Sequence, residues 1–475
     1  MIVVLAGLSG LMANADAATG TISVAAQDLR HGRHPGQNGK LTQEQERLAE
    51  AAWAYVEANM HPETCLVNSV DQYPSTTMWD LGSTISAYVA AFELGMIDAP
   101  DFDRRMTCLV SSLNRLPLFR GELPNKAYHT HTLEQVNYKN DPGEIGASAI
   151  DLGRLLLWLE IVKRRYPGYA EEIDRAVLRW NFCNVTDRAG SMYGAVAGEG
   201  DGVRYLQEGR LGYEEYAAAG FALWGFNTEA AAALEPYETM DIYGVPIAYD
   251  GRDPRKFGAH TYVVTESYLL SGIEMNWDVP GGTDPGNDLW HSDRPNAKLA
   301  RLVYKVQKRR WKRTGILTAR TEHQVVGEPF FVYDTVYSDG EAWNTLGVNG
   351  KQYPELASVS SKAVVGMSVL FDTRYTDRLF ASVQRLVDPM KGVEEGYIES
   401  TGKPIEARTI NTNGIALAAL LYKLQGRLLP PKGSDTLWDT VPNEEYPGYW
   451  QCLSGSAADR QKAEPQAGGS YQIGE

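Results

Sequence analysis

The chain has 475 residues, of which 43% are hydrophobic and 22% are charged, and it carries a formal net charge of −15. These values are ordinary for a globular protein, and the length allows either several average domains or one large single-domain architecture. The negative charge argues against a nucleic-acid partner, whose phosphates need a basic surface, and less strongly against a uronate polymer. The 26 Tyr and 11 Trp offer flat faces that suit either sugar rings or a large core.

The N-terminus is typical of a secretory signal. A short apolar run from Ile2 to Met12 precedes small residues that alternate around Ala13, Ala15 and Ala17. We therefore expect residues 1–20 to be a signal peptide, although the usual basic segment is missing, and the mature protein to be periplasmic or secreted. No later stretch reaches about 20 apolar residues, so we expect no membrane span in the mature protein.

Four cysteines would then lie in an oxidising compartment: Cys65, Cys108, Cys183 and Cys452. Their spacings match no zinc-binding pattern. Spacing leaves their pairing open, and buried free thiols are an equally good interpretation.

From about residue 41 onward the chain predicts one helix after another. The clearest strand-like run covers 324–336. Helices are expected at 41–60, 76–97, 102–116, 143–165, 169–182, 211–226, 259–275, 297–315, 356–371, 375–387 and 408–424, with a weak one at 228–240. The fold class is therefore all-α.

Two kinds of helix alternate along this series. One kind carries charges on one side, as solvent-facing helices do, and the other is rich in Ala, Gly, Ser and Leu nearly all round, as buried helices are. Six such pairs predict an (α/α)6 barrel over 41–430, with six inner and six outer helices and small β elements in the rim loops. A helical solenoid is the alternative, but the buried helices recur at irregular intervals of about 45 to about 100 residues. Residues 431–475 are expected to form a partly disordered extension.

In such a barrel the N-termini of all inner helices meet at one end. The long outer-to-inner loops, such as 115–143 and 183–211, should therefore carry function. Acids and aromatic residues recur there. The catalytic candidates are Glu214, Asp141, Glu144 and Asp80. The candidates for substrate binding are Trp79, Tyr213, Glu215, Tyr216, Glu208, His260, Glu395, Tyr397, Asn411 and Asn413.

Each candidate also has an ordinary structural interpretation. An acid in a first helical turn is stabilised by the helix dipole, and an aromatic residue is commonly part of the core. Recurrence favours a shared cavity, because capping does not explain aromatic residues beside the acids. Such a cavity suits a neutral sugar, since glycoside hydrolysis needs one carboxylic acid and one carboxylate. Glu214, in an apolar segment beside Glu215, is the expected general acid with a raised pKa.

His129 and His131 have strand spacing that places both rings on one side. A metal pair is conceivable, but no further ligand is evident nearby. We therefore expect neither a metal nor another cofactor.

The segments TTMWDLGSTISAYVAAFELGMI, IGASAIDLGRLLLWLEIVKRRYPGYAEEIDRAVLRW and EGRLGYEEYAAAGFALWG resemble the DUF3131 family of bacterial proteins, over about residues 45–430. This family is similar to glucoamylase-like (α/α)6 domains, including β-1,2-glucanases and the transglycosylating domain of cyclic β-1,2-glucan synthases. The resemblance implies a glycoside hydrolase acting on a β-glucan, with inversion at the anomeric carbon. It also implies that acids near the second and third inner helices matter, here Asp141 or Glu144, and Glu214.

The leading hypothesis is an exported glycoside hydrolase or transglycosylase that acts on a bacterial β-glucan, with β-1,2-glucan first. Its partner would be an oligo- or polysaccharide. Two alternatives remain: a non-catalytic protein that binds or assembles saccharides, and a polysaccharide lyase that uses Tyr128, His129 or His131.

Overall fold

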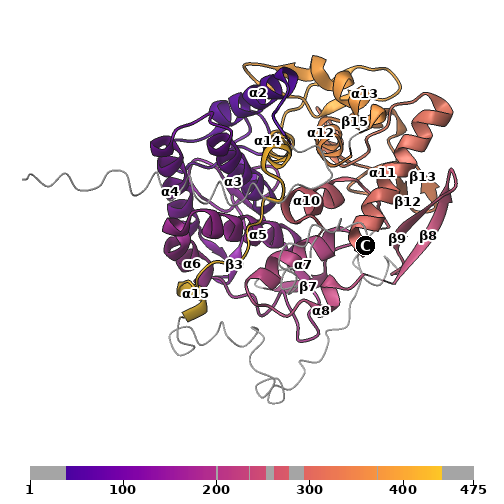
Figure 1. Ribbon diagram of the computed structural model, residues 1–475. Helices are drawn as coiled ribbons and strands as arrows, with labels where there is room; N and C mark the ends of the chain where they lie inside the picture. Colours follow the sequence, from indigo (N-terminus) through magenta and orange to yellow (C-terminus); the bar gives the residue numbers. More distant parts are fainter. Residues whose placement is uncertain are drawn as a thin grey trace, which may run out of the picture.

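The structure is a computed structural model that describes residues 39–440 apart from 199, 201, 235, 253–260, 278–293 and 372. Its centre is a closed ring of six helices, each packed against the next, with the last packed against the first (Figure 1). These inner helices are α3 (Met78–Glu93), α5 (Ala149–Arg165), α7 (Tyr213–Leu223), α10 (Glu266–Met275), α12 (Ser361–Leu370) and α14 (Ile410–Gln425). The ring confirms the predicted (α/α)6 barrel.

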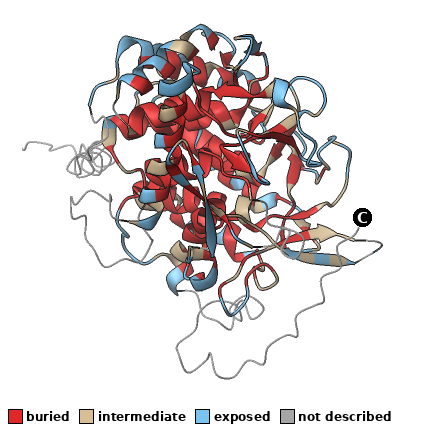
Figure 2. Ribbon diagram, turned by 90° about the vertical axis from the view of Figure 1, so that its right-hand side faces the viewer, coloured by how far each residue is buried: buried red, intermediate tan, exposed pale blue. Residues whose placement is uncertain are grey.

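An outer helix precedes each inner helix in the chain. These are α2 (Gln43–Asn59), α4 (Ala99–Arg115), α6 (Ala170–Leu178), α8 (Glu229–Ala232), α11 (Pro295–Thr314) and α13 (Arg374–Val383). The inner helices are buried on nearly every side, whereas the outer helices expose one face (Figure 2). This difference follows from composition, since a helix without a polar face must be surrounded by protein.

Small residues let the inner helices approach closely. A Cβ atom added at Gly153 of α5 would lie 2.5 Å from the carbonyl oxygen of Ala217, and one added at Gly220 of α7 would lie 1.9 Å from the carbonyl oxygen of Gly153. Neither position has room for a side chain, so the α5–α7 contact depends on glycine.

Short antiparallel strands occupy the rim loops. Three sheets lead directly into inner helices: β1 (Ser75–Thr77) with β4 (Ala127–His129); β5 (Gly146–Ala147) with β6 (Tyr193–Ala197) and β7 (Val203–Gln207); and β15 (Ser358–Ser360) with β18 (Gly396–Ile398) and β19 (Pro404–Ile405). A fourth sheet joins β10 (His323–Gln324), β11 (Phe331–Asp334) and β14 (Thr345–Gly347). The two-stranded pairs are β2 (Leu118–Phe119) with β3 (Leu123–Pro124), β8 (Tyr237–Ile242) with β9 (Val245–Asp250), β12 (Tyr337–Ser338) with β13 (Glu341–Ala342), and β16 (Val387–Asp388) with β17 (Gly392–Val393).

Three short 3₁₀ turns and one final helix complete the described chain: η2 (Pro167–Tyr169), η4 (Pro354–Leu356), η5 (Gln384–Leu386) and α15 (Leu437–Thr440). Trp438 of α15 is buried against Trp224, with ring centroids 4.8 Å apart. The segment after residue 430 therefore returns to the barrel before the described chain ends.

Several predicted helix boundaries were wrong. The helix expected over 143–165 begins only at Ala149, because Gly146 has φ +130° and pairs within a β-sheet. The helix expected over 259–275 begins at Glu266, and the one expected over 356–371 begins at Ser361 after strand β15. The weak helix expected over 228–240 shrinks to Glu229–Ala232, and strand β8 takes its second half.

A disulfide joins Cys65, in the α2–α3 connection, to Cys108 of α4, with the two Cα atoms 5.7 Å apart. Cys183 is disulfide-bonded as well. Among the described residues, no helix is both long and apolar enough to cross a membrane.

Candidate active site

Three carboxyl groups form an acid cluster at the N-terminal end of the barrel: Asp80, Asp151 and Glu208. Asp80 lies in the first turn of α3, where its carboxylate accepts hydrogen bonds from Ser69 Oγ at 2.5 Å and Thr77 Oγ1 at 2.8 Å. Burial raises the pKa of Asp80, and these two hydrogen bonds oppose the shift.

Asp151 lies in the first turn of α5, where its backbone N–H donates to Ser148, the N-cap residue. Glu208 comes from the loop before α7 and accepts hydrogen bonds from Ala149 N at 2.6 Å and Ile150 N at 3.4 Å. A carboxylate therefore sits on the positive end of α5, as the helix dipole favours.

Crowding of these carboxyl groups changes their titration. Burial raises the pKa of Asp151 to about 7, and the nearby charges of Glu208 and, more weakly, Asp80 contribute. Burial also raises the pKa of Glu208. As whole residues Asp151 and Glu208 are half-buried, and both carboxyl groups have a pKa above the usual range.

A second group of side chains, the central network, surrounds Glu266 of α10. Glu266 Oε1 accepts hydrogen bonds from Trp79 Nε1 at 3.2 Å and Asn411 Nδ2 at 3.0 Å. Lys362 Nζ pairs with Glu266 Oε2, and Arg154 Nη1 lies 3.8 Å from Oε1. Burial alone would raise the pKa of Glu266, but Lys362 and Arg154 hold it below its usual range. The network thus joins five of the six inner helices.

An aromatic wall borders these groups. The Arg210 guanidinium lies over three rings, 4.5 Å from the centroid of Tyr213, 5.2 Å from Tyr333 and 5.9 Å from Tyr262. Tyr213 also lies 5.6 Å from Trp79, centroid to centroid, and its hydroxyl donates to Glu322. Arg210 Nη2 is 3.3 Å from Glu322 Oε1. Flat faces beside carboxylates are the surroundings that sugar rings require.

The structure brings six predicted residues together at this end of the barrel: Asp80 and Glu208 in the acid cluster, Trp79 and Asn411 in the central network, Tyr213 in the aromatic wall, and Tyr216, whose ring lies 5.9 Å from Trp79. Glu395 is fully buried behind them. It accepts a hydrogen bond from Thr409 Oγ1 at 2.5 Å, and its charge acts on Lys362.

The adjacent acids of α7 have different surroundings. Glu215 accepts a hydrogen bond from Gly212 N at 2.7 Å and so caps its own helix, while burial raises its pKa to about 8. Glu214 accepts hydrogen bonds from Gln207 Nε2 at 3.0 Å and forms an ion pair with Arg252 at 2.8 Å. Both carboxyl groups are buried.

Four predicted residues have surroundings other than those expected. Asp141 is exposed in a turn with Asn137, and Glu144 pairs with Arg120 at 3.4 Å, because the chain before Ala149 is not helical. Tyr397 points to outer helix α13, where it donates to Ser382 Oγ. Asn413 is buried and exchanges hydrogen bonds with the backbone of Val393. His260 lies outside the described residues.

Sequence reasoning missed Asp151, Arg154, Arg210, Glu322 and Lys362. One signal was available for Asp151: Ser148 and Asp151 have the spacing of an N-cap residue and its N3 partner, which places the helix start at Ala149. The other four become recognisable only through partners that are distant in sequence.

His131 lies near His129, 6.5 Å away between ring centroids, and 3.7 Å from the carboxylate of Glu63. His131 is exposed and stacks on His61, with ring centroids 5.5 Å apart. Within the described ranges, no group of three or more His, Cys, Asp or Glu side chains has the geometry to hold a metal ion.

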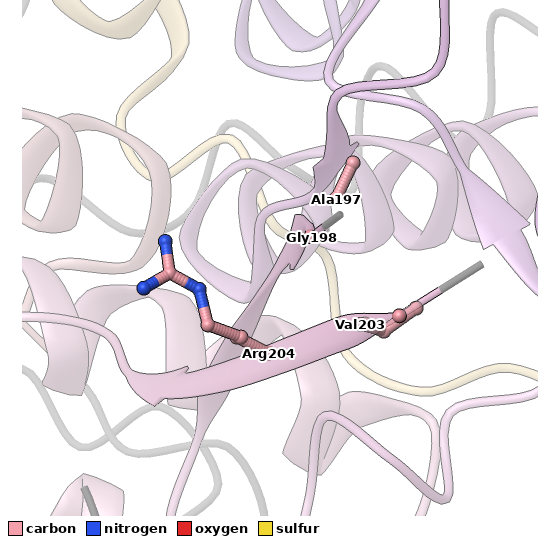
Figure 3. A pocket seen from close by; sticks show the side chains of 5 residues that line it. Ala197, Gly198, Val203 and Arg204 are labelled. Carbon is pink, nitrogen blue, oxygen red and sulfur yellow. The ribbon is translucent and has the colours of Figure 1, made fainter. Parts of the chain in front are cut away.

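A separate hollow of about 590 Å³ lies at the tip of the β6–β7 hairpin. Figure 3 shows Ala197 and Gly198 on one arm of the hairpin and Val203 and Arg204 on the other. None of the acid cluster lines this hollow, so we do not assign it to the site.

Three solved structures share this fold. An endo-β-1,2-glucanase from Chitinophaga pinensis, in complex with sophorotriose and glucose, is 13% identical with a TM-score of 0.59, and the match covers 87% of this chain and 98% of that one. A provisionally named glucoamylase from Bacteroides caccae is 13% identical with a TM-score of 0.58, and the match covers 86% of this chain and 98% of that one. An endo-β-1,2-glucanase mutant from Talaromyces funiculosus, in complex with β-1,2-glucan, is 11% identical with a TM-score of 0.53, and the match covers 89% of this chain and 90% of that one. At these identities the similarity shows the fold alone.

Sequence comparison with curated proteins finds no match. A family model described as "Protein of unknown function (DUF3131)" matches residues 47–426. The chain therefore belongs to the DUF3131 family.

Proposed function

We propose that this protein is an exported glycoside hydrolase, or transglycosylase, that acts on a β-glucan, with β-1,2-glucan as the first substrate to test. The observation that carries the proposal is the acid cluster. It combines a half-buried residue, whose carboxyl group has a pKa of about 7, with two neighbouring carboxyl groups. The cluster lies where the inner helices have their N-termini, in a barrel fold that is similar to that of a β-1,2-glucanase. The disulfide between Cys65 and Cys108 supports an extracytoplasmic location, such as the bacterial periplasm.

Asp151 is the general acid in this proposal. Protonating the leaving oxygen requires a carboxyl group that still holds its proton near neutral pH, and the surroundings of Asp151 provide this. Glu214 was the sequence-based choice. Its carboxylate is held by Arg252 and Gln207, so it would have to leave both partners to reach a leaving oxygen.

Glu322 is the candidate for the second carboxylate, which would activate water on the other face of the sugar. Tyr333 lies close enough to both carboxyl groups to sense their charges. Burial raises the pKa of its phenol, Arg210 opposes this shift, and the charges of Glu322 and Asp151 raise the pKa further. Arg210 and Tyr213 stabilise a negative charge on Glu322. Direct attack by water would invert the anomeric configuration.

The test is a panel of β-1,2-, β-1,3-, β-1,4- and mixed-linkage β-glucans plus α-glucans, with products separated by chromatography. We expect short oligosaccharides from one linkage. Asp151→Asn should lower the rate by about 10²–10⁴-fold, as loss of a general acid does. Asp141→Asn is the matched control, because Asp141 is exposed, and it should retain activity within about twofold.

Other outcomes would change the assignment. An active Asp151→Asn variant beside an inactive Glu214→Gln variant would return the acid role to Glu214. Binding of a glucan without any cleavage would instead support the saccharide-binding alternative. The lyase alternative is weakened because Tyr128 is fully buried and donates to the carbonyl oxygen of Pro117.

A further inference from the structure

Outer helix α11 carries an unusual concentration of positive charge. Its twenty residues, PNAKLARLVYKVQKRRWKRT, include eight Lys or Arg and no acid, in a chain whose net charge is −15. At 100° per residue, seven of these eight cations, all except Arg310, fall within an arc of about 140° around the helix axis. From the first of them to the last, the row extends about 22 Å along the helix. We call these seven residues the basic stripe: Lys298, Arg301, Lys305, Lys308, Arg309, Lys312 and Arg313.

Four members of the basic stripe face outward, whereas Arg309 donates hydrogen bonds to the carbonyl oxygens of Tyr243 and Gly244 in the β8–β9 turn. The opposite side of α11 is buried against the barrel through residues such as Leu299, Val303 and Val306. Lys298, Lys305, Lys312 and Arg313 are exposed, and the helix lies on the outer flank beside strand β9 (Figure 1).

The lysines of the basic stripe differ in their surroundings from the exposed cations of other outer helices. On α4 and α6 the exposed cations pair with acids one turn away, as Arg104 does with Asp101 and Arg175 with Glu171. Within the part of the chain that the structure describes, no acidic side chain forms an ion pair with Lys298, Lys305, Lys308 or Lys312. Burial and then the charge of Lys312 lower the pKa of Lys308, which shows that the stripe crowds its own charges. Like charges one turn apart destabilise a helix, so an external anion would relieve this repulsion.

We propose that the basic stripe docks the protein on an anionic membrane surface, a role beyond the proposed glycosidase activity. The stripe lies on an outer helix and four of its side chains are exposed, so a flat surface could contact them together. Four of its members are lysines, whose compact, hydrated charges suit diffuse attraction to headgroups rather than bidentate recognition. The apolar side of α11 already packs on the barrel, so attachment would be electrostatic and reversible.

Vesicle cosedimentation of the purified mature protein tests this. We expect binding to phosphatidylcholine vesicles that contain phosphatidylglycerol and none to phosphatidylcholine alone. High salt should abolish binding, since the Debye length falls from about 10 Å at about 0.1 M to about 3 Å at about 1 M. The Lys298→Gln, Lys305→Gln, Lys308→Gln, Lys312→Gln variant should bind at least about a hundredfold more weakly, because each lysine contributes to the attraction.

A control variant changes the net charge equally at exposed lysines elsewhere: Lys139→Gln, Lys351→Gln, Lys391→Gln and Lys403→Gln. It should bind within about threefold of the wild type. Circular dichroism would verify that both variants fold. Equal losses in the two variants, or no binding to anionic vesicles, would overturn the proposal. Capture of the protein by a soluble polyanion such as dextran sulfate, without vesicle binding, would overturn it too.

Discussion

Glu214 and Glu215 show how adjacent residues of one type acquire different roles. Glu215 satisfies a local requirement, because its carboxylate caps the first turn of α7 through Gly212 N. Glu214 satisfies a tertiary one, because its partners Gln207 and Arg252 lie in other elements. Residues one apart on a helix point about 100° apart. Local chemistry therefore accounts for one acid of the pair, and only the fold accounts for the other.

Glu274 provides a prediction at the same scale. It is fully buried in α10, where it accepts hydrogen bonds from Tyr216 at 2.5 Å and Trp158 at 2.8 Å, and burial raises its pKa to about 7. In an unfolded chain the pKa of a Glu side chain is about 4.3. Its contribution to stability is thus fully present below about pH 4 and is lost as pH rises through about 7.

In Glu274→Gln this titration disappears. The free energy of unfolding should then fall less than in the wild type between about pH 5 and about pH 8, by roughly 1–3 kcal/mol. Chemical denaturation at several pH values measures this difference. The control is Glu50→Gln, an exposed change on α2, which should follow the wild-type curve. Parallel curves for Glu274→Gln would contradict the raised pKa.

At the scale of elements, the start of each inner helix decides which acids enter the site. Because strand β5 precedes it, α5 begins only at Ala149. Asp141 and Glu144 therefore lie before the helix and outside the site, whereas Asp151 lies in the first helical turn and belongs to the acid cluster. A Cβ atom at Gly146 would lie 1.9 Å from the carbonyl oxygen of Ala195. The glycine therefore permits the sheet that sets this boundary.

The α5–α7 contact gives the prediction for this scale. Gly220→Ala should lower the free energy of unfolding by about 2–3 kcal/mol, because its methyl group would overlap the backbone of Gly153. Gly168→Ala is the matched control, since no atom lies within 4 Å of an added Cβ there, and its effect should stay within about 1 kcal/mol. Denaturant titration measures both variants. Equal stability of the two would show that α7 can shift away from α5 without cost.

For the whole molecule, the return of the chain after residue 430 extends the folded unit. Trp438 Nε1 donates to the carbonyl oxygen of Trp224 at 3.1 Å, and Trp438 N donates to Asp174 Oδ2 at 2.8 Å. Helix α15 thus fastens α6 to the end of α7. The predicted boundary at 430 marks the end of the helical ring and leaves out this contact.

Trp438→Ala should therefore destabilise the barrel by about 3 kcal/mol, through loss of buried aromatic surface and an unpaired carbonyl group. Trp438→Phe keeps the ring contact with Trp224 and loses only the Nε1 hydrogen bond, so its cost should be about 1 kcal/mol. Thermal unfolding monitored by circular dichroism compares the two variants. A loss below about 0.5 kcal/mol in Trp438→Ala would show that the barrel is complete without α15.

The sequence by itself determined the barrel. The alternation of buried and one-sided helices depends on side-chain polarity at a period of 3.6 residues, which can be read without tertiary information. It also placed Trp79, Asp80, Glu208, Tyr213 and Asn411 near one end, because helices that run in the same direction begin at the same end. These predictions concern where a residue lies along its own helix or in the loop just before it.

The tertiary structure alone decided the partners and the electrostatics. Arg252 lies 38 residues after Glu214 in the numbering and still neutralises it, and Lys362 reaches Glu266 from another helix. The same structure brought Asp151, absent from the predicted site, close to Glu208 and raised its pKa to about 7. Ion pairs and pKa shifts depend on distance and burial, and both arise only when segments remote in sequence pack together.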